Sequence, residues 1–248
     1  MMINTGDFWA INQGGIGNEL CKMCVKDFEA LDIPWAFAWG NHDEVNDYGL
    51  AHQTLEKSKK SLYRGGAADG NYRVAILDEK GNPAINLIFL NNSRGGFKQE
   101  QIDWFDAETE KIKKETPLLP PAYLFFHIPA TQYDDIAHAG NSKGVKFEKV
   151  CHENGSMDAV PAFKKAGFVR GMFCGHDHIN DYHGDFKGVR LEYGRAMGGY
   201  GADKVRKGGK IITIDLKTGD CETMSVFGDG TSVAYDKFIN VPEPGKIY

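Results

Sequence analysis

Histidine and acidic side chains in this sequence gather just after short apolar runs of the kind that form buried strands. Asp7 follows residues 3–6 (INTG), and His127 follows residues 123–126 (YLFF). The triplets Asn41-His42-Asp43 and His176-Asp177-His178 come after two further runs of this kind. Side chains at the carboxyl ends of strands in an α/β sheet meet in one place. We therefore expect these residues to form a single site.

The residue types in this set predict a metal site. Carboxylate, imidazole and amide oxygen donors suit divalent transition ions such as Mn²⁺, Fe²⁺ or Zn²⁺. A lone histidine after a strand is more often structural, but here two histidines lie one residue apart and three more ligand-type positions accompany them. None of the five cysteines is placed to join the set, which argues against a structural zinc site of the cysteine type.

Helical and strand patterns alternate along the first two thirds of the chain, which predicts the α/β class. Helices are expected at residues 18–31, 52–62, 99–114 and 157–166. Strands are expected at residues 34–39, 72–77, 85–90, 123–126 and 169–173. Antiparallel hairpins are expected over residues 182–193 and 210–226, and Asp134–His138 is expected to be a loop that is either solvated or at the rim of the site.

Bulk properties narrow the class further. A length of 248 residues with no linker or repeat favours one domain over residues 1–248, with residues 228–248 as a surface tail. The net charge of −5 argues against a nucleic-acid-binding surface. No apolar run is long enough to span a membrane, and no signal peptide is visible in this chain.

Taken in order, Gly6-Asp7, Gly40–Asp43, His127 and Gly175–His178 resemble the successive blocks of the calcineurin-like metallophosphoesterase superfamily. Residues 125–129 (FFHIP) and 173–184 (FCGHDHINDYHG) resemble the branch related to purple acid phosphatases. The resemblance implies an α/β sandwich of two mixed sheets flanked by helices. In this chain the first strand and helix of that fold are expected to be missing.

The resemblance also implies roles for individual residues in a two-metal site. Asp7 would bridge both ions, and His178 would join it on the second ion. The first ion would be held by Asn41, His127 and His176. The imidazole of His42 would contact the phosphate and assist the leaving oxygen, and Asp43 would orient that imidazole. Of the other residues, Asn92 and Arg94 are candidates for contacting the substrate.

Two positions depart from the family pattern. The family's first block, an Asp-x-His before Gly-Asp, is absent, because only six residues precede Asp7 and none is Asp or His. The ion shared by Asp7 and His178 would then lack two protein ligands, so the chain is expected to hold either two ions or only one. Purple acid phosphatases carry a tyrosine ligand for ferric iron where this chain has Ala10, so no tyrosinate colour is expected.

The expected activity is the hydrolysis of phosphate monoesters through a metal-activated water, on a small phosphorylated substrate or a phosphoprotein. A phosphodiesterase acting on nucleotides or lipids is the enzyme alternative. A catalytically impaired module that binds metal or phosphate is the alternative from another class. A missing strand exposes a sheet edge, which favours a homodimer. Location stays open, including a secreted or periplasmic parent protein, because a leader would precede the missing block.

Overall fold

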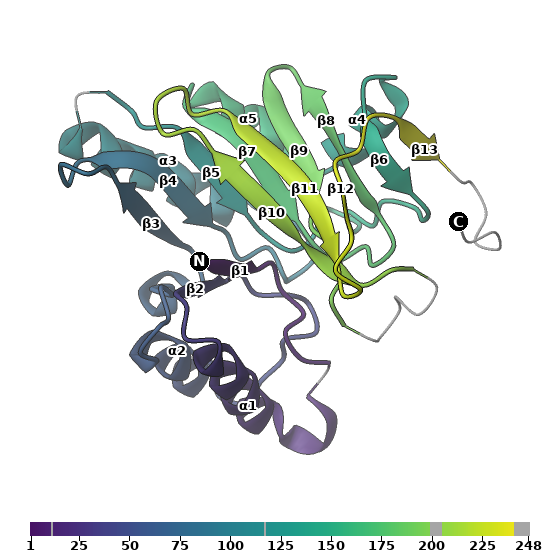
Figure 1. Cartoon of the computed structure of the whole chain (residues 1–248). Coiled ribbons are helices and arrows are strands. Elements are labelled where there is room, and N and C mark those ends of the chain that lie inside the picture. Colours follow the sequence, from purple (N-terminus) through teal and green to yellow (C-terminus); the bar gives the residue numbers. More distant parts are fainter. Residues whose placement is uncertain (11, 117, 199–204, 241–248) are drawn as a thin grey trace.

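The computed structural model describes residues 1–10, 12–116, 118–198 and 205–240 (Figure 1). The helices are α1 (Gly17–Ala30), α2 (Tyr48–Lys57), α3 (Gln99–Glu115), α4 (Gln132–His138) and α5 (Ala159–Lys165), with short 3-10 turns η1 (Gln13–Gly15) and η2 (Gly66–Ala68). The strands of the first two thirds are β1 (Met2–Asn4), β2 (Trp35–Phe37), β3 (Tyr72–Leu77), β4 (Pro83–Phe89), β5 (Ala122–Phe125) and β6 (Lys143–Lys146). The remaining strands are β7 (Val169–Cys174), β8 (Asp181–Phe186), β9 (Val189–Tyr193), β10 (Gly208–Ile214), β11 (Cys221–Phe227), β12 (Ser232–Val233) and β13 (Phe238–Asn240).

A mixed sheet of eight strands forms the centre of the molecule, in the order β13-β6-β8-β9-β7-β5-β4-β3. Its inner strands β4, β5, β7 and β9 run parallel to one another. The strands β3 and β8 pair antiparallel to this parallel block. The α/β class predicted from the sequence is therefore confirmed, with helices flanking a large mixed sheet.

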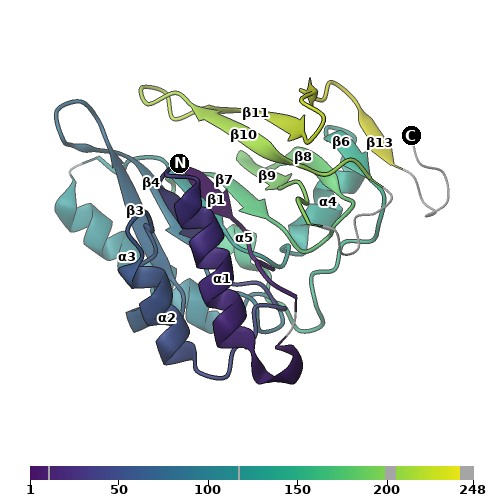
Figure 2. The same ribbon diagram turned by 60° about the horizontal axis from the view of Figure 1, so that its bottom comes forward.

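The two faces of this sheet pack against different partners, and alternate residues of each strand enter different cores. Ile88 and Leu124 belong to the core under α3, α4 and α5, whereas the neighbouring Phe89 and Phe125 belong to the core shared with β1, β2, α1 and α2. This alternation is the period of two expected for strands buried on both faces. Figure 2 shows the N-terminal helices and the β10–β11 pair outside the large sheet.

Two small sheets form the second layer of the sandwich. One is the parallel pair β1-β2, and the other is the antiparallel sheet β10-β11-β12. Buried charges join the second of these to the large sheet. The ammonium of Lys210 on β10 lies 2.8 Å from Oδ1 of Asp181 and 2.7 Å from Oε1 of Glu192, and both carboxylates are fully buried.

Most predicted elements are confirmed, including the helix α3, the hairpin β3-β4 and the two C-terminal hairpins. The predicted bounds of the second helix were wrong. The side chain of Asp47 accepts from the N–H of Leu50 and starts α2 at Tyr48, and the backbone becomes extended at Ser58.

The loop expected over Asp134–His138 was also wrong, because these residues lie in helix α4. Tyr133 and Ile136 anchor that helix in the core. Sequence reasoning missed the short strands β6, β12 and β13. In the region expected to be a tail, β13 pairs with β6, while residues 241–248 lie outside the described residues. Within the described residues, no helix is both long enough and apolar enough to cross a membrane.

Candidate metal centre

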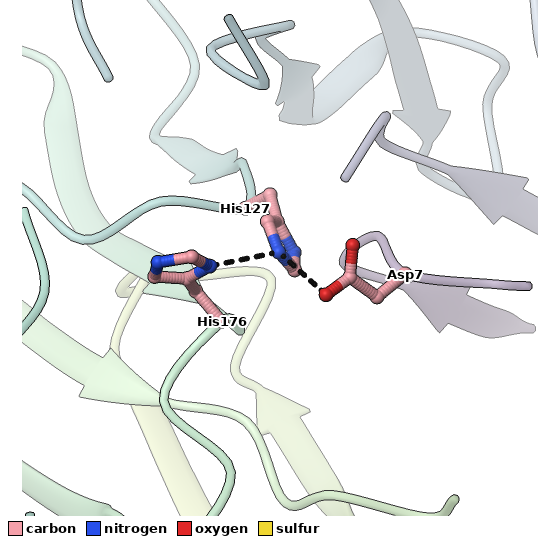
Figure 3. Close-up of side chains that lie close together, drawn as sticks. All are labelled: Asp7, His127 and His176. Carbon is pink, nitrogen blue, oxygen red and sulfur yellow. Dashed lines mark hydrogen bonds and ion pairs between the residues drawn. The ribbon is translucent and has the colours of Figure 1, made fainter. Parts of the chain in front are cut away.

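Four strand ends bring the predicted ligands together. Asp7 follows β1, Asn41 follows β2, His127 follows β5 and His176 follows β7. The ligand atoms of Asp7, His127 and His176 lie within 4.8 Å of one another. Figure 3 shows the His127 imidazole between the other two side chains. The structure thus brings together residues that are far apart in the sequence.

The atoms that converge are those that could hold one ion. Nε2 of His127 lies 3.1 Å from Oδ2 of Asp7 and 3.3 Å from Nδ1 of His176. Oδ1 of Asn41 completes the group, at 3.0 Å from each of these two ring nitrogens. One carboxylate oxygen, one amide oxygen and two imidazole nitrogens form a donor set that suits Mn²⁺, Fe²⁺ or Zn²⁺.

The proton on His127 shows that this set fits a cation. Nδ1 of His127 lies 2.7 Å from the carbonyl oxygen of Thr5, and a carbonyl can only accept, so Nδ1 carries the proton. In the neutral imidazole, Nε2 then presents a lone pair. That lone pair faces the oxygens of Asp7 and Asn41, which are themselves acceptors. These facing acceptors are satisfied either by a second proton on Nε2, in line with the raised pKa of His127, or by a cation bound between them.

Burial and the neighbouring charges shape the ionisation of the three titratable ligands. Burial acts to raise the pKa of Asp7, but the hydrogen bonds and charges of His127 and His42 together leave it lowered. Burial acts to lower the pKa of His127, but the hydrogen bond and charge of Asp7 leave it raised. Burial, followed by the charge of His127, lowers the pKa of His176 to about 4. His176 is therefore neutral at neutral pH, with its ring available as a ligand.

The backbone at two of the ligands is strained. Asp7 has φ 55° and His176 has φ 70°, a left-handed conformation that costs a residue with a side chain about 1 kcal/mol. The turn at Asp7 also needs two glycines, one that precedes it in sequence and one that packs against it from the end of β2. A Cβ at Gly6 would lie 2.5 Å from Nδ1 of His127, and a Cβ at Gly40 would lie 2.1 Å from the backbone nitrogen of Asp7.

A cavity of about 490 Å³ opens beside these ligands. His42 and His178 line it together with Asp7, His127 and His176. The backbone N–H of His42 donates to Oδ1 of Asp7 at 2.9 Å, which fixes the second oxygen of that carboxylate. Five of the six residues predicted to bind metal or phosphate therefore line one cavity, and the sixth, Asn41, contacts two of them, His127 and His176.

The other predicted residues are engaged elsewhere. Asn92 is buried, and its Oδ1 accepts from the N–H groups of His127 and Ile128. Arg94 is exposed and pairs with Asp69 at 2.9 Å. Neither residue lines the cavity. That they contact the substrate stays a prediction.

Asp43 was expected to orient His42. In the part of the chain that the structure describes, its hydrogen bonds go to backbone N–H groups and not to the His42 imidazole. Burial, and then the charge of Asp7, raise the pKa of Asp43 to about 7, and the N–H groups of Gly40 and Trp9 act in the opposite direction.

Sequence reasoning missed one hydrogen bond that supports a ligand and one carboxylate close to another ligand. The Thr5 carbonyl holds His127, and the carboxylate of Glu153 lies 3.8 Å from Nε2 of His176. A backbone carbonyl has no sequence signal, and Glu153 lies in a segment without strand or helix periodicity. Of the glycine-rich stretch at residues 194–201, residues 194–198 line the cavity and residues 199–201 lie outside the described part.

Comparison with known families gives a match over most of the chain. The family model described as calcineurin-like phosphoesterase matches residues 1–180. This region includes Asp7, Asn41, His127, His176 and His178.

Curated relatives also match. The chain is 26% identical over 221 residues to "Probable inactive purple acid phosphatase 29" of Arabidopsis thaliana, covering 75% of the chain and 57% of the relative. It is 27% identical over 183 residues to "Phosphatase DCR2" of Saccharomyces cerevisiae, covering 62% of the chain and 31% of the relative. The chain thus spans little more than half the length of the first of these relatives and about a third of the second.

One solved structure with the same fold is a dimetal phosphatase from Danio rerio. Its TM-score is 0.51 at 12% sequence identity, over 91% of this chain and 77% of that one. At this identity the similarity shows the fold alone.

Proposed function

The chain belongs to the calcineurin-like phosphoesterase family, and from this premise we propose that it hydrolyses phosphate monoesters, on a small molecule or a phosphoprotein. Membership of this family implies divalent metal ions. The observation that carries the proposal is the convergence of four acceptor atoms beside an open cavity, from Asp7, Asn41, His127 and His176.

A bound divalent cation supplies positive charge to phosphoryl oxygens and makes a water acidic at neutral pH. The residues of this chain hold and orient the reactants. The Thr5 carbonyl keeps the proton of His127 on Nδ1, so that Nε2 stays a ligand. The His42 ring, at the wall of the cavity, donates a ring N–H to the leaving oxygen of the ester.

A second candidate function, a module that binds metal or phosphate without fast turnover, is favoured by the uneven distribution of ligands. Four side chains are available for the first ion. For the second ion, the part of the chain that the structure describes offers only two predicted ligands, Asp7 and His178. Three Arabidopsis relatives are named as probable inactive purple acid phosphatases, and this similarity also supports the binding module.

Metal content and turnover, measured together, separate the two candidates. The purified chain would be loaded with Mn²⁺, Fe²⁺ or Zn²⁺, and its metal content determined by mass spectrometry. It would then be assayed on p-nitrophenyl phosphate and on bis(p-nitrophenyl) phosphate. Hydrolysis of the monoester alone supports the proposal, and hydrolysis of the bis-ester supports a phosphodiesterase.

One bound ion, or none, with negligible turnover supports the binding module, and two tightly held ions with normal turnover contradict it. His42→Asn supplies the matched variant. It should keep the metal and lose about 10²- to 10⁴-fold in kcat, because the ring acts on the leaving oxygen and not on the ion. The homodimer and the single-domain organisation stay predictions, and light scattering measures the first of these.

A further inference from the structure

Asp43 is a buried carboxylate beside the metal centre with four hydrogen bonds to backbone N–H groups. Its side chain is 1% exposed. Oδ1 accepts from the N–H groups of Phe8 at 2.7 Å and Trp9 at 3.1 Å. Oδ2 accepts from the N–H groups of Asp7 at 2.8 Å and Gly40 at 2.7 Å. Each oxygen thus takes two backbone donors.

Three of these donors are consecutive, and they belong to the turn that carries the ligand Asp7. A run of backbone N–H groups that point to one place forms a small anion-binding concavity. In this structure the carboxyl group of Asp43 occupies that place. The turn is held in the left-handed conformation at Asp7, which an unsupported chain would leave.

The fourth donor ties the turn to the neighbouring strand end. Gly40 precedes Asn41, another ligand, so one carboxylate holds the backbones on which two ligands are carried. The N–H of His42 then fixes Oδ1 of Asp7 and leaves Oδ2 directed at His127.

We propose that Asp43 is a positioning residue of the metal centre, which fixes the turn of residues 7–9 so that the Asp7 carboxylate is placed before the ion arrives. This inference rests on the proposed function, because fixing the turn affects metal binding only if Asp7 is a metal ligand. It differs from the role expected from the sequence, in which Asp43 orients His42.

The geometry requires two acceptor oxygens at position 43. An asparagine has the same shape, but its NH₂ group would face two backbone N–H donors in either orientation of the amide. Two donors would then be left unsatisfied in a buried place. Asp43→Asn should therefore loosen the turn while changing the volume of the side chain very little.

The test is a titration of the metal-free protein with Mn²⁺ by isothermal calorimetry. Asp43→Asn should bind Mn²⁺ at least tenfold more weakly than the wild type, as supporting residues of metal ligands generally do when altered. The control is Asn86→Ala. Asn86 is also fully buried, and its amide bonds to Arg73 and to the carbonyl of Pro120, but it lies in β4 away from the ligands. It should lose stability and keep the wild-type affinity. An unchanged affinity in Asp43→Asn overturns the proposal.

Hydrogen exchange of the wild type gives a second readout that needs no variant to fold. In the metal-free protein, the amides of residues 7–9 should exchange slowly, and rapid exchange there overturns the proposal even if Asp43→Asn does not fold. A wild type that binds no Mn²⁺ contradicts the proposed function instead. These two failures are distinguishable, because exchange is read without metal.

Discussion

The proton of His127 is placed by a backbone carbonyl, and that choice has a chemical consequence. A carboxylate in the same position would share the proton and add negative charge next to the ligand. The neutral Thr5 carbonyl fixes the tautomer without adding charge. The net charge at the ion is therefore set mainly by Asp7, with Asn41 and the histidines contributing neutral donors.

Replacing a single ligand should be more damaging than replacing a supporting residue. His176→Ala removes one of the four converging atoms that are proposed to hold the first ion. We expect its affinity for Mn²⁺ to fall by more than about 100-fold, beyond the range typical of supporting residues. Calorimetric titration measures the change. His138→Ala, at an exposed histidine of α4, is the control and should bind as the wild type does. Equal affinities in the two variants would remove His176 from the ligand set.

The types of the ligands could be predicted from the sequence, whereas most of their supports could not. Asp7, His127 and His176 are recognisable because each follows a buried apolar run. The role of Asp43 depends on the left-handed turn at Asp7, which directs three N–H groups to one point. No residue type encodes that convergence, so Asp43 was associated with its sequence neighbour His42.

At the scale of elements, the sheet β10-β11-β12 depends on charges as well as apolar contacts. The ammonium of Lys210 forms ion pairs with Asp181 and Glu192 of the large sheet. In the other direction, the guanidinium of Arg190 on β9 donates to the hydroxyl of Thr223 on β11. Burial acts to lower the pKa of Lys210, but the charges of Glu192 and Asp181 leave it raised. The ammonium is thus charged in a place where water does not screen it.

Removing this ammonium should separate the small sheet from the large one. Lys210→Met leaves Glu192 paired with Arg190 at 2.6 Å but removes from the buried Asp181 its nearest cation, and we expect a loss of about 3–5 kcal/mol in the free energy of unfolding. Urea unfolding followed by circular dichroism measures the loss. Lys113→Met breaks an exposed pair with Glu110 and should change stability by at most about 0.5 kcal/mol. Similar losses in both variants would show that the buried network contributes little.

The elements that were predicted well carry their own periodic signal. Helix α3 has Ile102, Phe105 and Ile112 on its buried face, and its bounds agree with the pattern to within one residue. Strand β6 has no such signal, because Lys143-Gly144-Val145-Lys146 forms a strand only by pairing with β8 and β13. Its conformation comes from tertiary contacts, which sequence periodicity cannot report.

At the scale of the whole molecule, His183 should contribute less to stability in mild acid than at neutral pH. Burial lowers the pKa of His183 from 6.5 to about 4; the charge of Glu192 opposes this, and the charges of Arg190, Lys210 and Lys143 act with it. Between pH 6.5 and 4 the unfolded chain binds a proton that the folded chain does not. Folding is therefore favoured above pH 6.5, and this contribution is lost as the pH falls towards 4.

His183→Gln isolates this contribution from other groups that titrate in the same range. The free energy of unfolding would be measured for both proteins at pH 7, 5.5 and 4.5 in the presence of a chelator. The wild type should lose more stability than the variant as the pH falls. Parallel curves for the two proteins would show that His183 does not contribute.

The four residues proposed to hold the first ion are contributed by segments that span residues 7 to 176. Each segment provides one donor, so no short fragment of the chain can chelate the ion. An ion held in this way closes a loop of the chain that the unfolded state leaves open. Its escape is then linked to the opening of strand ends that are far apart in sequence. The ion should thus slow global unfolding and protect the chain from proteases that act on opened forms.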